Sequence, residues 1–462
     1  MAIDSTSMME EVWSIIGNGG QAVSSYWTAE ITVNDGKSDT VIPALAVTSI
    51  DVVRDYVNNY GDEIFVEVLL GPGTFSHDIY PYKNNLTMTL YRHPNGEVST
   101  ATDLTKDIES QVMRATLVDD MSAVVAGVIQ HMQDKKAADI SDLLYVKFQL
   151  VDLTLEQVRM QTVGGVFRKT TSADALTYIL TEVSSQVAVD DEHRVQGVDI
   201  YPPSNTEPQD HIVIPHGSRF PDVPGYINDE CAALYNAGFG FYIQKRHWYV
   251  YPLFDLTRFD KDLKTLTLFN VPKNRFPQIE RTFRRTANQV LAIVTGDVLH
   301  KDDSESKQLN EGNGVRYADA RKVFDSFALT ENNKTTIQRA QNNSEFLTES
   351  RPNGLNNVQL SPRPITSNTF RELSAMTRRS GAFISCVWEN SDPGAIFPGM
   401  PVKYLYLVGN DVIETVGVVV QAHHFIGTSS PGITNRRHIC NSALTLFVSK
   451  QIQWPSTSTQ PS

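Results

Sequence analysis

The chain of 462 residues has 41% apolar and 9% aromatic residues, a composition that predicts a globular protein of about two to four domains. No apolar run reaches the roughly 18 residues of a membrane span, and residues 1–20 are acidic where a signal peptide would be basic, so neither membrane insertion nor Sec export is expected. The net charge is −13, and sixteen acidic residues stand against five basic ones from Met1 to Ser110, which argues against tight nucleic-acid binding.

The acidic first quarter leaves two interpretations open. It is either an ordinary solvated surface or the wall of a passage through which a polyanion slides without sticking. The three cysteines, Cys231, Cys386 and Cys440, are odd in number and far apart in the sequence. They predict isolated buried thiols in a reducing compartment, because neither a disulfide framework nor a zinc site has this spacing.

From Tyr26 to Leu153 the sequence has the texture of a sheet or barrel, in which β-favouring segments alternate with turn signals. In Glu63–Leu70 apolar and mostly polar residues alternate, as a strand with one buried face requires. Met121–Met132 fits a helix or an apolar loop equally well. The predicted strands are Trp27–Val33, Val41–Val53, Glu63–Leu70, Leu86–Arg92, Ser110–Leu117 and Leu143–Leu153.

The central region begins with a predicted helix, Ala173–Ser184, for which Ser172 is the candidate N-cap. An apolar stripe at i, i+3, i+4 and i+7 runs along it, as on a helix that packs on a core. After an irregular Pro-rich connector that begins at Tyr201, a short strand is expected at His211–Pro215.

The stretch from Asp222 to Asp260 predicts a helix, a turn and a hairpin in unbroken order. Asn228 is the expected N-cap of the helix, and Gly238 is expected to end it. Phe239–Gln244 and Trp248–Phe254 predict paired strands, and Pro252 within the second suggests an edge strand. Nothing in this unit is arranged for chemistry, so we interpret it as a packing module.

In the last region strands return around two long polar insertions, Lys301–Arg316 and Glu331–Asn357, which cannot bury enough surface to order themselves without a partner. A short helix is expected at Phe370–Thr377 and a frayed tail from Trp454. The basic cluster Arg281, Arg284 and Arg285 suggests a solvated or subunit-pairing face. The predicted strands are Leu263–Phe269, Gln289–Thr295, Ala382–Trp388, Val402–Val408, Val412–His424 and Ile439–Val448.

No catalytic, cofactor-binding or metal-binding residue emerges from the sequence. Nucleotide-binding glycine loops, zinc-protease motifs and nucleophile elbows are absent. His423 and His424, with His438 near them in sequence, suggest a metal site at first sight, but adjacent strand residues point to opposite faces. The acidic run at Asp302 lacks calcium-loop spacing, and Asp190 begins a turn-forming acidic run. An enzyme is not expected, although a pair of carboxylates brought together by the fold stays open as an alternative.

The order of elements gives the chain a resemblance. A helix like that at Ala173–Ser184, a Pro-rich connector, a strand that ends in Ile214-Pro215, a second helix, and Gly-Phe-Gly-Phe-Tyr-Ile-Gln before Trp-Tyr-Val-Tyr-Pro-Leu-Phe resemble the central hub proteins of contractile phage tail baseplates. The front part of type VI secretion spike proteins is similar. The β-rich flanks, roughly Tyr26–Leu153 and Gln289–Val448, fit the two tube-like barrels of that family.

The resemblance implies an α+β, mainly β fold with two tube-like antiparallel barrels and a helix-plus-hairpin region between them. The expected domains are residues 1–155, 156–270 and 271–462. It further implies a homotrimer that adapts a six-fold tail tube or tube-initiator protein to a three-fold central spike, contacts baseplate wedge proteins, and lets DNA pass without binding it specifically. Such a protein belongs to the virion and is assembled in the host cytoplasm. A cell-wall or polysaccharide hydrolase and a receptor-binding β protein of the tail tip are the alternatives.

Overall fold

A computed structural model of the chain describes residues 5–22, 25–94, 109–118, 143–190, 193–272, 279–296, 377–378, 381–408, 411–428 and 437–449, and the backbone of 328–331, 334–338 and 346–350. All structural statements below refer to these residues. Several predicted features lie outside them: Met121–Met132, Lys301–Arg316, nearly all of Phe370–Thr377, and the tail from Trp454.

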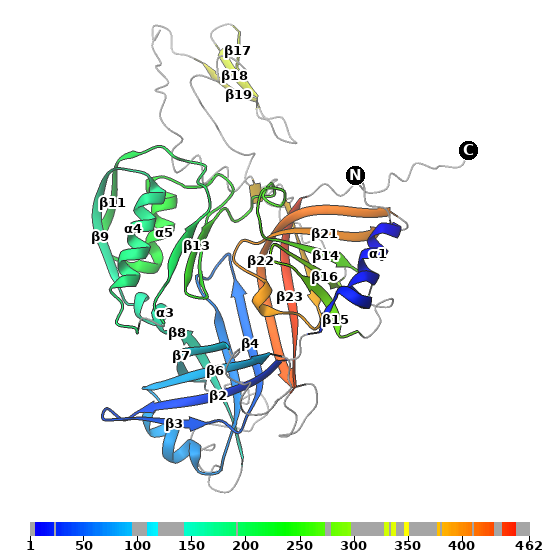
Figure 1. Cartoon of the computed structure of the whole chain (residues 1–462). Coiled ribbons are helices and arrows are strands. Elements are labelled where there is room, and N and C mark those ends of the chain that lie inside the picture. Colours follow the sequence, from blue (N-terminus) through cyan, green and yellow to red (C-terminus); the bar gives the residue numbers. More distant parts are fainter. Residues whose placement is uncertain are drawn as a thin grey trace, which may run out of the picture.

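The fold is mainly β, as predicted, and one 15-stranded sheet runs through both β-rich regions (Figure 1). Its strands from the first region are β2 (Ser25–Asn34), β3 (Asp39–Pro43), β4 (Ala46–Asp55), β5 (Glu63–Leu70), β6 (Leu86–Pro94), β7 (Glu109–Leu117) and β8 (Leu144–Asp152). Those from the rest of the chain are β1 (Gln21–Ala22), β14 (Thr265–Asn270), β15 (Arg281–Arg285), β16 (Gln289–Val294), β20 (Gly381–Trp388), β21 (Pro401–Val408), β22 (Asp411–Thr428) and β23 (His438–Ser449).

The first barrel is closed by strands from the far end of the sequence. Its hydrogen-bonded order is β2, β6, β7, β8, β5, β4, then β22 and β23, and a single pairing of Ser25 with His438 joins β23 back to β2. Alternating residues of these strands fill the interior, among them Val66, Phe148 and Met88, which are fully buried. The alternation predicted in β5 is therefore confirmed. The predicted strand Val41–Val53 is two strands, β3 and β4, because the chain leaves the ladder between Pro43 and Ala46.

The second barrel uses the same two long strands. Its order is β20, β23, β22, β21, β14 and β16, and hydrogen bonds between Thr295 and Val387, at 2.8 and 2.7 Å, link the end of β16 to β20. Both pairings of β14, with β16 and with β21, are parallel, whereas the sequence predicted antiparallel strands throughout. Trp388, Tyr404 and Phe447 are fully buried in this core.

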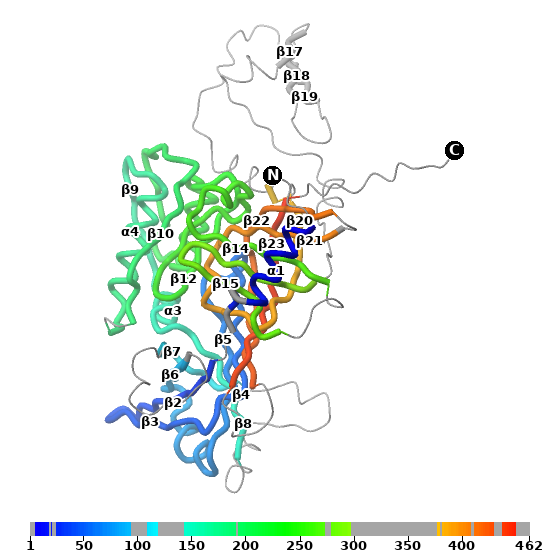
Figure 2. The backbone as a smooth tube through the Cα atoms, turned by 45° about the vertical axis from the view of Figure 1, so that its right-hand side comes forward, coloured from blue at the N-terminus to red at the C-terminus, as the bar shows by residue number. Residues whose placement is uncertain are grey.

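The two barrels therefore share β22 and β23 rather than meeting as separate bodies. β22 contacts β21 with its first half and β4 with its second half, and β23 lies beside it along most of its length. Figure 2 shows these orange and red strands continuing from one barrel into the other, next to the blue strands of the first region. Because a strand is stiff along its axis, this arrangement fixes the relative orientation of the barrels.

The middle region packs its own helices and two small sheets beside the barrels (Figure 1). Helix α4 (Ser172–Ser185) confirms the predicted helix, but its cap is Thr171, whose hydroxyl accepts a hydrogen bond from the Asp174 amide at 3.1 Å, and not Ser172. The predicted strand His211–Pro215 is the middle of a longer one. The elements not predicted as such are helix α3 (Leu153–Val158), the ribbon of β9 (Thr162–Thr170) with β11 (Gln209–Arg219), and β10 (Gly197–Ile200).

The helix expected after Asn228 is wrong. Helical turns instead run from Phe220 to Cys231, as η5 (Phe220–Asp222), α5 (Val223–Tyr226) and η6 (Ile227–Cys231), with Pro residues in the first turns. Asn228 lies inside the last turn, where its side chain accepts a hydrogen bond from the Leu234 amide at 3.2 Å and so holds the chain after the helix. Gly238 lies in that following loop with φ +83°.

The predicted hairpin is confirmed as β12 (Gly240–Gln244) and β13 (His247–Tyr251), which are antiparallel. Lys245 and Arg246 form its two-residue turn with φ of 49° and 63°, the combination of a type I′ turn. The prediction from Pro252 that the second strand of the hairpin is an edge strand is wrong. β13 is the central strand between β10 and β12, and it ends before Pro252.

Two further segments depart from expectation. Residues 5–19, for which the sequence predicts no element, form α1 (Ser5–Ser14) and a π turn, and they cover the outer face of β14, β16 and β21 through Met8, Val12 and Ile15. The backbone of the second polar insertion contains β18 (Lys334–Gln338) and β19 (Phe346–Ser350), and β18 pairs with both β17 (Ala328–Glu331) and β19 in a separate sheet.

Candidate functional site

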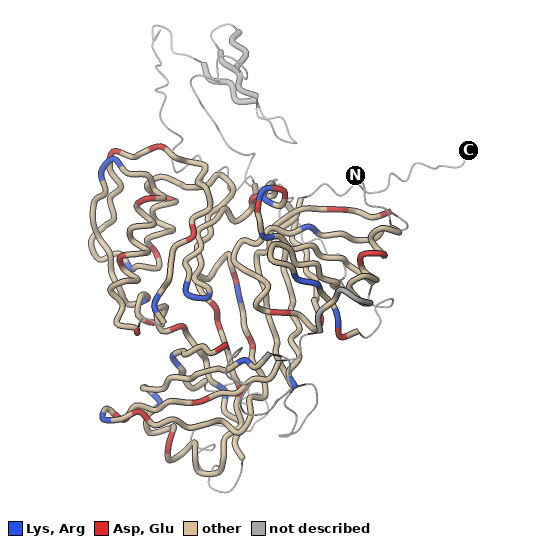
Figure 3. The backbone as a smooth tube through the Cα atoms, in the orientation of Figure 1, with Lys and Arg blue, Asp and Glu red and all other residues tan. Residues whose placement is uncertain are grey.

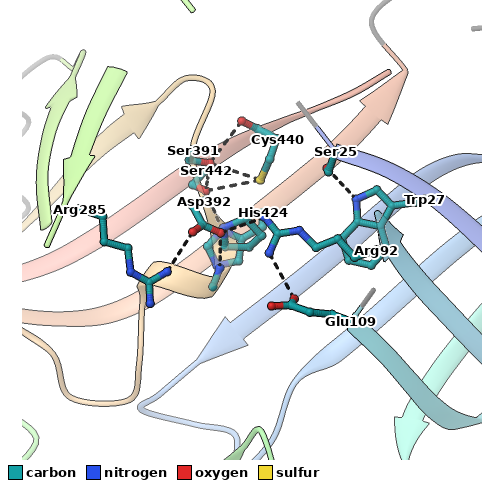
Figure 4. Close-up of polar contacts among 12 residues, drawn as sticks. Ser25, Trp27, Arg92, Glu109, Arg285, Ser391, Asp392, His424, Cys440 and Ser442 are labelled. Atoms are coloured by element: carbon teal, nitrogen blue, oxygen red, sulfur yellow. Dashed lines mark hydrogen bonds and ion pairs between the residues drawn. The ribbon is translucent and has the colours of Figure 1, made fainter. Parts of the chain in front are cut away.

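A buried polar network lies where the two barrels and the middle region meet, and Figure 4 shows the part around His424, Ser442 and Asp392. Its centre is Arg54 on β4, a residue that is 7% exposed. Arg54 Nε donates to Asp62 Oδ2 at 3.1 Å, and Nη1 donates to the Pro393 carbonyl at 2.7 Å and to His424 Nε2 at 3.1 Å. One side chain therefore connects the first barrel, a loop of the second barrel and a shared strand.

Asp62 extends the network into the middle region. Its Oδ1 accepts a hydrogen bond from the hydroxyl of Tyr242, on β12, at 2.9 Å. Burial, followed by the charge of Asp62, raises the pKa of Tyr242, so the phenol keeps its proton and remains a donor. Burial is the largest influence on the pKa of Arg54 and lowers it, but the charge of Asp62, its hydrogen bond and the nearby Tyr56 and Tyr242 together raise the pKa by more, so the guanidinium stays charged.

His424 continues the network in the other direction, into β23. Its Nδ1 lies 2.6 Å from Ser442 Oγ, and Ser442 Oγ lies 2.6 Å from Ser391 Oγ, which is 3.3 Å from the Cys440 sulfur. Burial, and then the positive charges of Arg54 and His423, lower the pKa of His424 well below its usual range. The imidazole is therefore neutral at physiological pH.

The hydrogen-bond partners fix the tautomer of His424. Because a guanidinium can only donate, Nε2 must be the accepting nitrogen and Nδ1 must carry the proton. Nδ1 therefore donates to Ser442 Oγ and cannot take a proton from it, as the base of a hydrolytic Ser–His pair would have to. Ser442 is fully buried as well. These hydrogen bonds therefore hold β22, β23 and the loop of Ser391 together, and they do not activate Ser442 as a nucleophile.

Asp392 forms a second centre beside the first, in the loop before the short turn η9 (Pro393–Ala395). Its Oδ1 is 3.2 Å from Arg92 Nη2 and accepts from the Gly394 amide at 3.0 Å, and its Oδ2 is 3.1 Å from Arg285 Nη1. Arg92 lies on β6 of the first barrel and Arg285 on β15 of the second. The carboxylate therefore bridges the two barrels, with Glu109 as a further partner of Arg92 at 3.4 Å.

The residues that the sequence singled out fall in different places. His423 and His424 do point to opposite faces: His423 is exposed beside Asp51 at 3.3 Å, and His424 is buried. His438 is also buried, and its Nε2 lies 2.9 Å from the Val47 carbonyl oxygen. Within the described ranges no three His, Cys, Asp or Glu side chains lie close enough to hold a metal ion. No helix of the described residues is long and apolar enough to cross a membrane.

The cysteines and the basic cluster complete this comparison. Cys386 and Cys440 are buried free thiols, as predicted, and Cys231 is half-buried. Arg281 and Arg285 are exposed and Arg284 is half-buried; Arg281 Nη1 also donates to the Gly17 carbonyl and Arg284 Nη2 pairs with Glu11, at 3.2 and 3.4 Å. Sequence reasoning missed Arg54, Asp62 and Asp392. The available signal was a single arginine within an apolar, alternating strand, which needs a partner when it is buried.

Comparisons with known proteins add structural likeness alone. No protein-family model matches the sequence, and a search of curated proteins finds no match. The 43 kDa tail protein of prophage MuSo2 from Shewanella oneidensis is similar over 91% of this chain and 98% of its own, with a TM-score of 0.44 and 9% identity. An E. coli component of the type VI secretion system is similar over 88% of this chain and 74% of its own, with a TM-score of 0.39 and 8% identity.

A third structure, the half-lidded Francisella PdpA–VgrG complex, is similar over 97% of this chain and 62% of the matched chain, with a TM-score of 0.38 and 9% identity. The superpositions are loose at these TM-scores. The first of these structures is a prophage tail protein, and the second is a component of the type VI secretion system.

Proposed function

We propose that the chain is the hub of a contractile-tail baseplate, in which three copies surround one axis. The observation that carries the proposal is the sharing of β22 and β23 by two closed barrels within one chain. Three such chains would place six barrels around the axis, held in fixed pairs. A ring of that kind adapts a six-fold tube on one side to a three-fold spike on the other.

The buried network supports this role through its position. Arg54 and Asp392 each connect elements of both barrels, and through Asp62 the middle region is included. A ring that transmits force during tail contraction requires its two barrels to keep one relative orientation. Buried charged groups that are held by several ion pairs and hydrogen bonds favour a single arrangement over its alternatives.

The hub would also let DNA pass through its lumen. Asp51, Glu63 and Glu67 lie on the outward faces of β4 and β5, because the residues between them fill the first barrel. Figure 3 marks the acidic and basic positions along the backbone. If this outer face lines the lumen, its negative charge repels the phosphates and keeps the DNA from binding. The neutral surface of a purely polar wall would lack that repulsion.

The remaining parts of the proposal concern partners and location. The tail tube or a tube-initiator protein, the central spike and the baseplate wedge proteins are the expected neighbours. The expected location is the virion, after assembly in the host cytoplasm. We keep the three domains at residues 1–155, 156–270 and 271–462 as a proposal for how the chain is organised in sequence, with β22 and β23 inserted into the first barrel.

Native mass spectrometry of the purified chain, alone and with its co-expressed spike protein, tests the proposal. The expected result is a species of three times the 51.5 kDa of one chain, formed by the chain itself or on the spike. A chain that stays monomeric in both samples would contradict the ring. Turnover of peptidoglycan or polysaccharide by the same preparation would favour a hydrolase instead.

A further inference from the structure

A pocket of about 350 Å³ lies beside the η9 turn. It is formed by the β12–β13 hairpin with Gln244 and Lys245, the β15–β16 turn with Arg285, Lys264 just before β14, Asp199 on β10, and the loop from Gly394 to Met400. It adjoins the network, because Arg285 is also a partner of Asp392. The lining of the pocket has a distinct chemical character.

The rim of the pocket is cationic in a chain of net charge −13. Lys245, Lys264 and Arg285 line it against a single carboxylate, Asp199. The side-chain amines of Lys245 and Lys264 make no hydrogen bond or ion pair with the part of the chain that the structure describes, and both residues are exposed. Arg285 pairs with Asp392 through Nη1, but its side chain remains 47% exposed. The rim therefore offers donors to an anionic group.

The wall of the pocket offers hydrogen-bond acceptors and its floor is apolar, unlike the cationic rim. Gln244 is 5% exposed, and its Nε2 donates to the Ile396 carbonyl at 3.1 Å, whereas its Oε1 is a buried acceptor without a hydrogen-bond partner among the described residues. Asp199 is a second acceptor on this side. Ile396 and Met400 provide an apolar floor. An occupant that satisfies all three surfaces carries one negative group, N–H donors and an apolar side chain.

We propose that this pocket docks an extended peptide segment of a partner protein that carries an acidic side chain next to an apolar one. The carboxylate pairs with the cationic rim, the peptide N–H groups face Gln244 and Asp199, and the apolar side chain covers the floor formed by Ile396 and Met400. A phosphate or a nucleic acid fits less well, because Asp199 repels a multiply charged anion. The proposal does not depend on the trimer, since the pocket is complete within one chain.

Binding to the full-length protein can be measured by fluorescence anisotropy with a labelled Gly-Ser peptide that contains one Glu between two Leu residues. We expect saturable binding that weakens with salt. The K245Q/K264Q variant should bind about tenfold more weakly, because two charge-assisted contacts are lost. K37Q is the matched control, since Lys37 is an exposed lysine on the β2–β3 hairpin. It should bind as the parent protein does.

The same peptide with Gln in place of Glu, and competition by inorganic phosphate, complete the test. We expect the Gln peptide to lose at least tenfold in affinity and phosphate to compete poorly at equal concentration. Hydrogen exchange should slow at residues 285–290 and 244–245 when the Glu peptide is added. The proposal would be overturned by equal binding to K245Q/K264Q, by equal binding of the Gln peptide, by phosphate competing as well as the peptide, or by no binding at all. None of these results would alter the expected mass of the assembled chain.

Discussion

Replacing Arg54 by Met should loosen the junction of the two barrels more than the loss of any surface charge does. The variant removes the donor to Asp62, to the Pro393 carbonyl and to His424 Nε2 at once. It leaves the Asp62 carboxylate, whose side chain is 19% exposed, without its cation. Removing one partner of a buried ion pair costs about 3–5 kcal/mol, and the partial exposure of Asp62 favours the lower end, about 3 kcal/mol. If the whole chain unfolds as one unit, that loss lowers the melting temperature by roughly 3 °C.

Differential scanning calorimetry of three variants separates this reasoning from a general loss of packing. R54M/D62N should recover part of the loss, because no uncompensated charge stays buried. R219M, which breaks the exposed pair of Arg219 and Asp222, should change stability by less than about 1 kcal/mol. The reasoning would be refuted if R54M melted no lower than R219M, or if the double variant were less stable than R54M.

Three further outcomes follow from the same packing. The melting temperature should be level above about pH 7 and should fall as the pH drops below about 6.5, because the folded-state pKa of His424 is depressed and the unfolded chain takes up the proton first. In H424N the melting temperature should fall less over this pH range. An H424N profile identical to that of the parent protein would contradict the prediction. Iodoacetamide at mildly alkaline pH should modify the native chain at Cys231 and spare Cys440, because burial raises the pKa of Cys440 to about 11. Peptide mapping identifies the labelled thiols. Equal labelling of both would contradict the burial of Cys440. G417A should lower the stability of the fold by about 1–3 kcal/mol, because its new Cβ would overlap the backbone of β23. The control G165A should be nearly neutral, because a Cβ there meets nothing within 4 Å. Equal melting temperatures for the two variants would contradict the close packing of β22 on β23.

Local sequence patterns predicted those elements whose stability is local. The alternation in β5 and β8 matched their buried faces, and the stripe on α4 matched its packing. The hairpin of β12 and β13 also followed from its aromatic strands and polar turn. In each case the residues that decide the structure are neighbours in the sequence, so periodicity was sufficient.

Features that depend on distant residues were not predictable in this way. The pairing of β4 with β22 joins residues more than 360 positions apart, and no local pattern indicates it. Asn228 is a residue type that often caps the start of a helix, yet its side chain accepts a hydrogen bond from the Leu234 amide. The helical turns begin earlier, at Pro221 and Pro224. The partners of Arg54 likewise come from three separate regions, so only its need for partners was visible.

Electron cryomicroscopy of the assembled tail that contains this chain tests the central claim most directly. The account predicts three copies on the tail axis, between the tube and the spike, with six barrels around one lumen and the outward faces of β4 and β5 toward it. Density for the chain at the periphery of the particle, or in a copy number other than three at the axis, would contradict it.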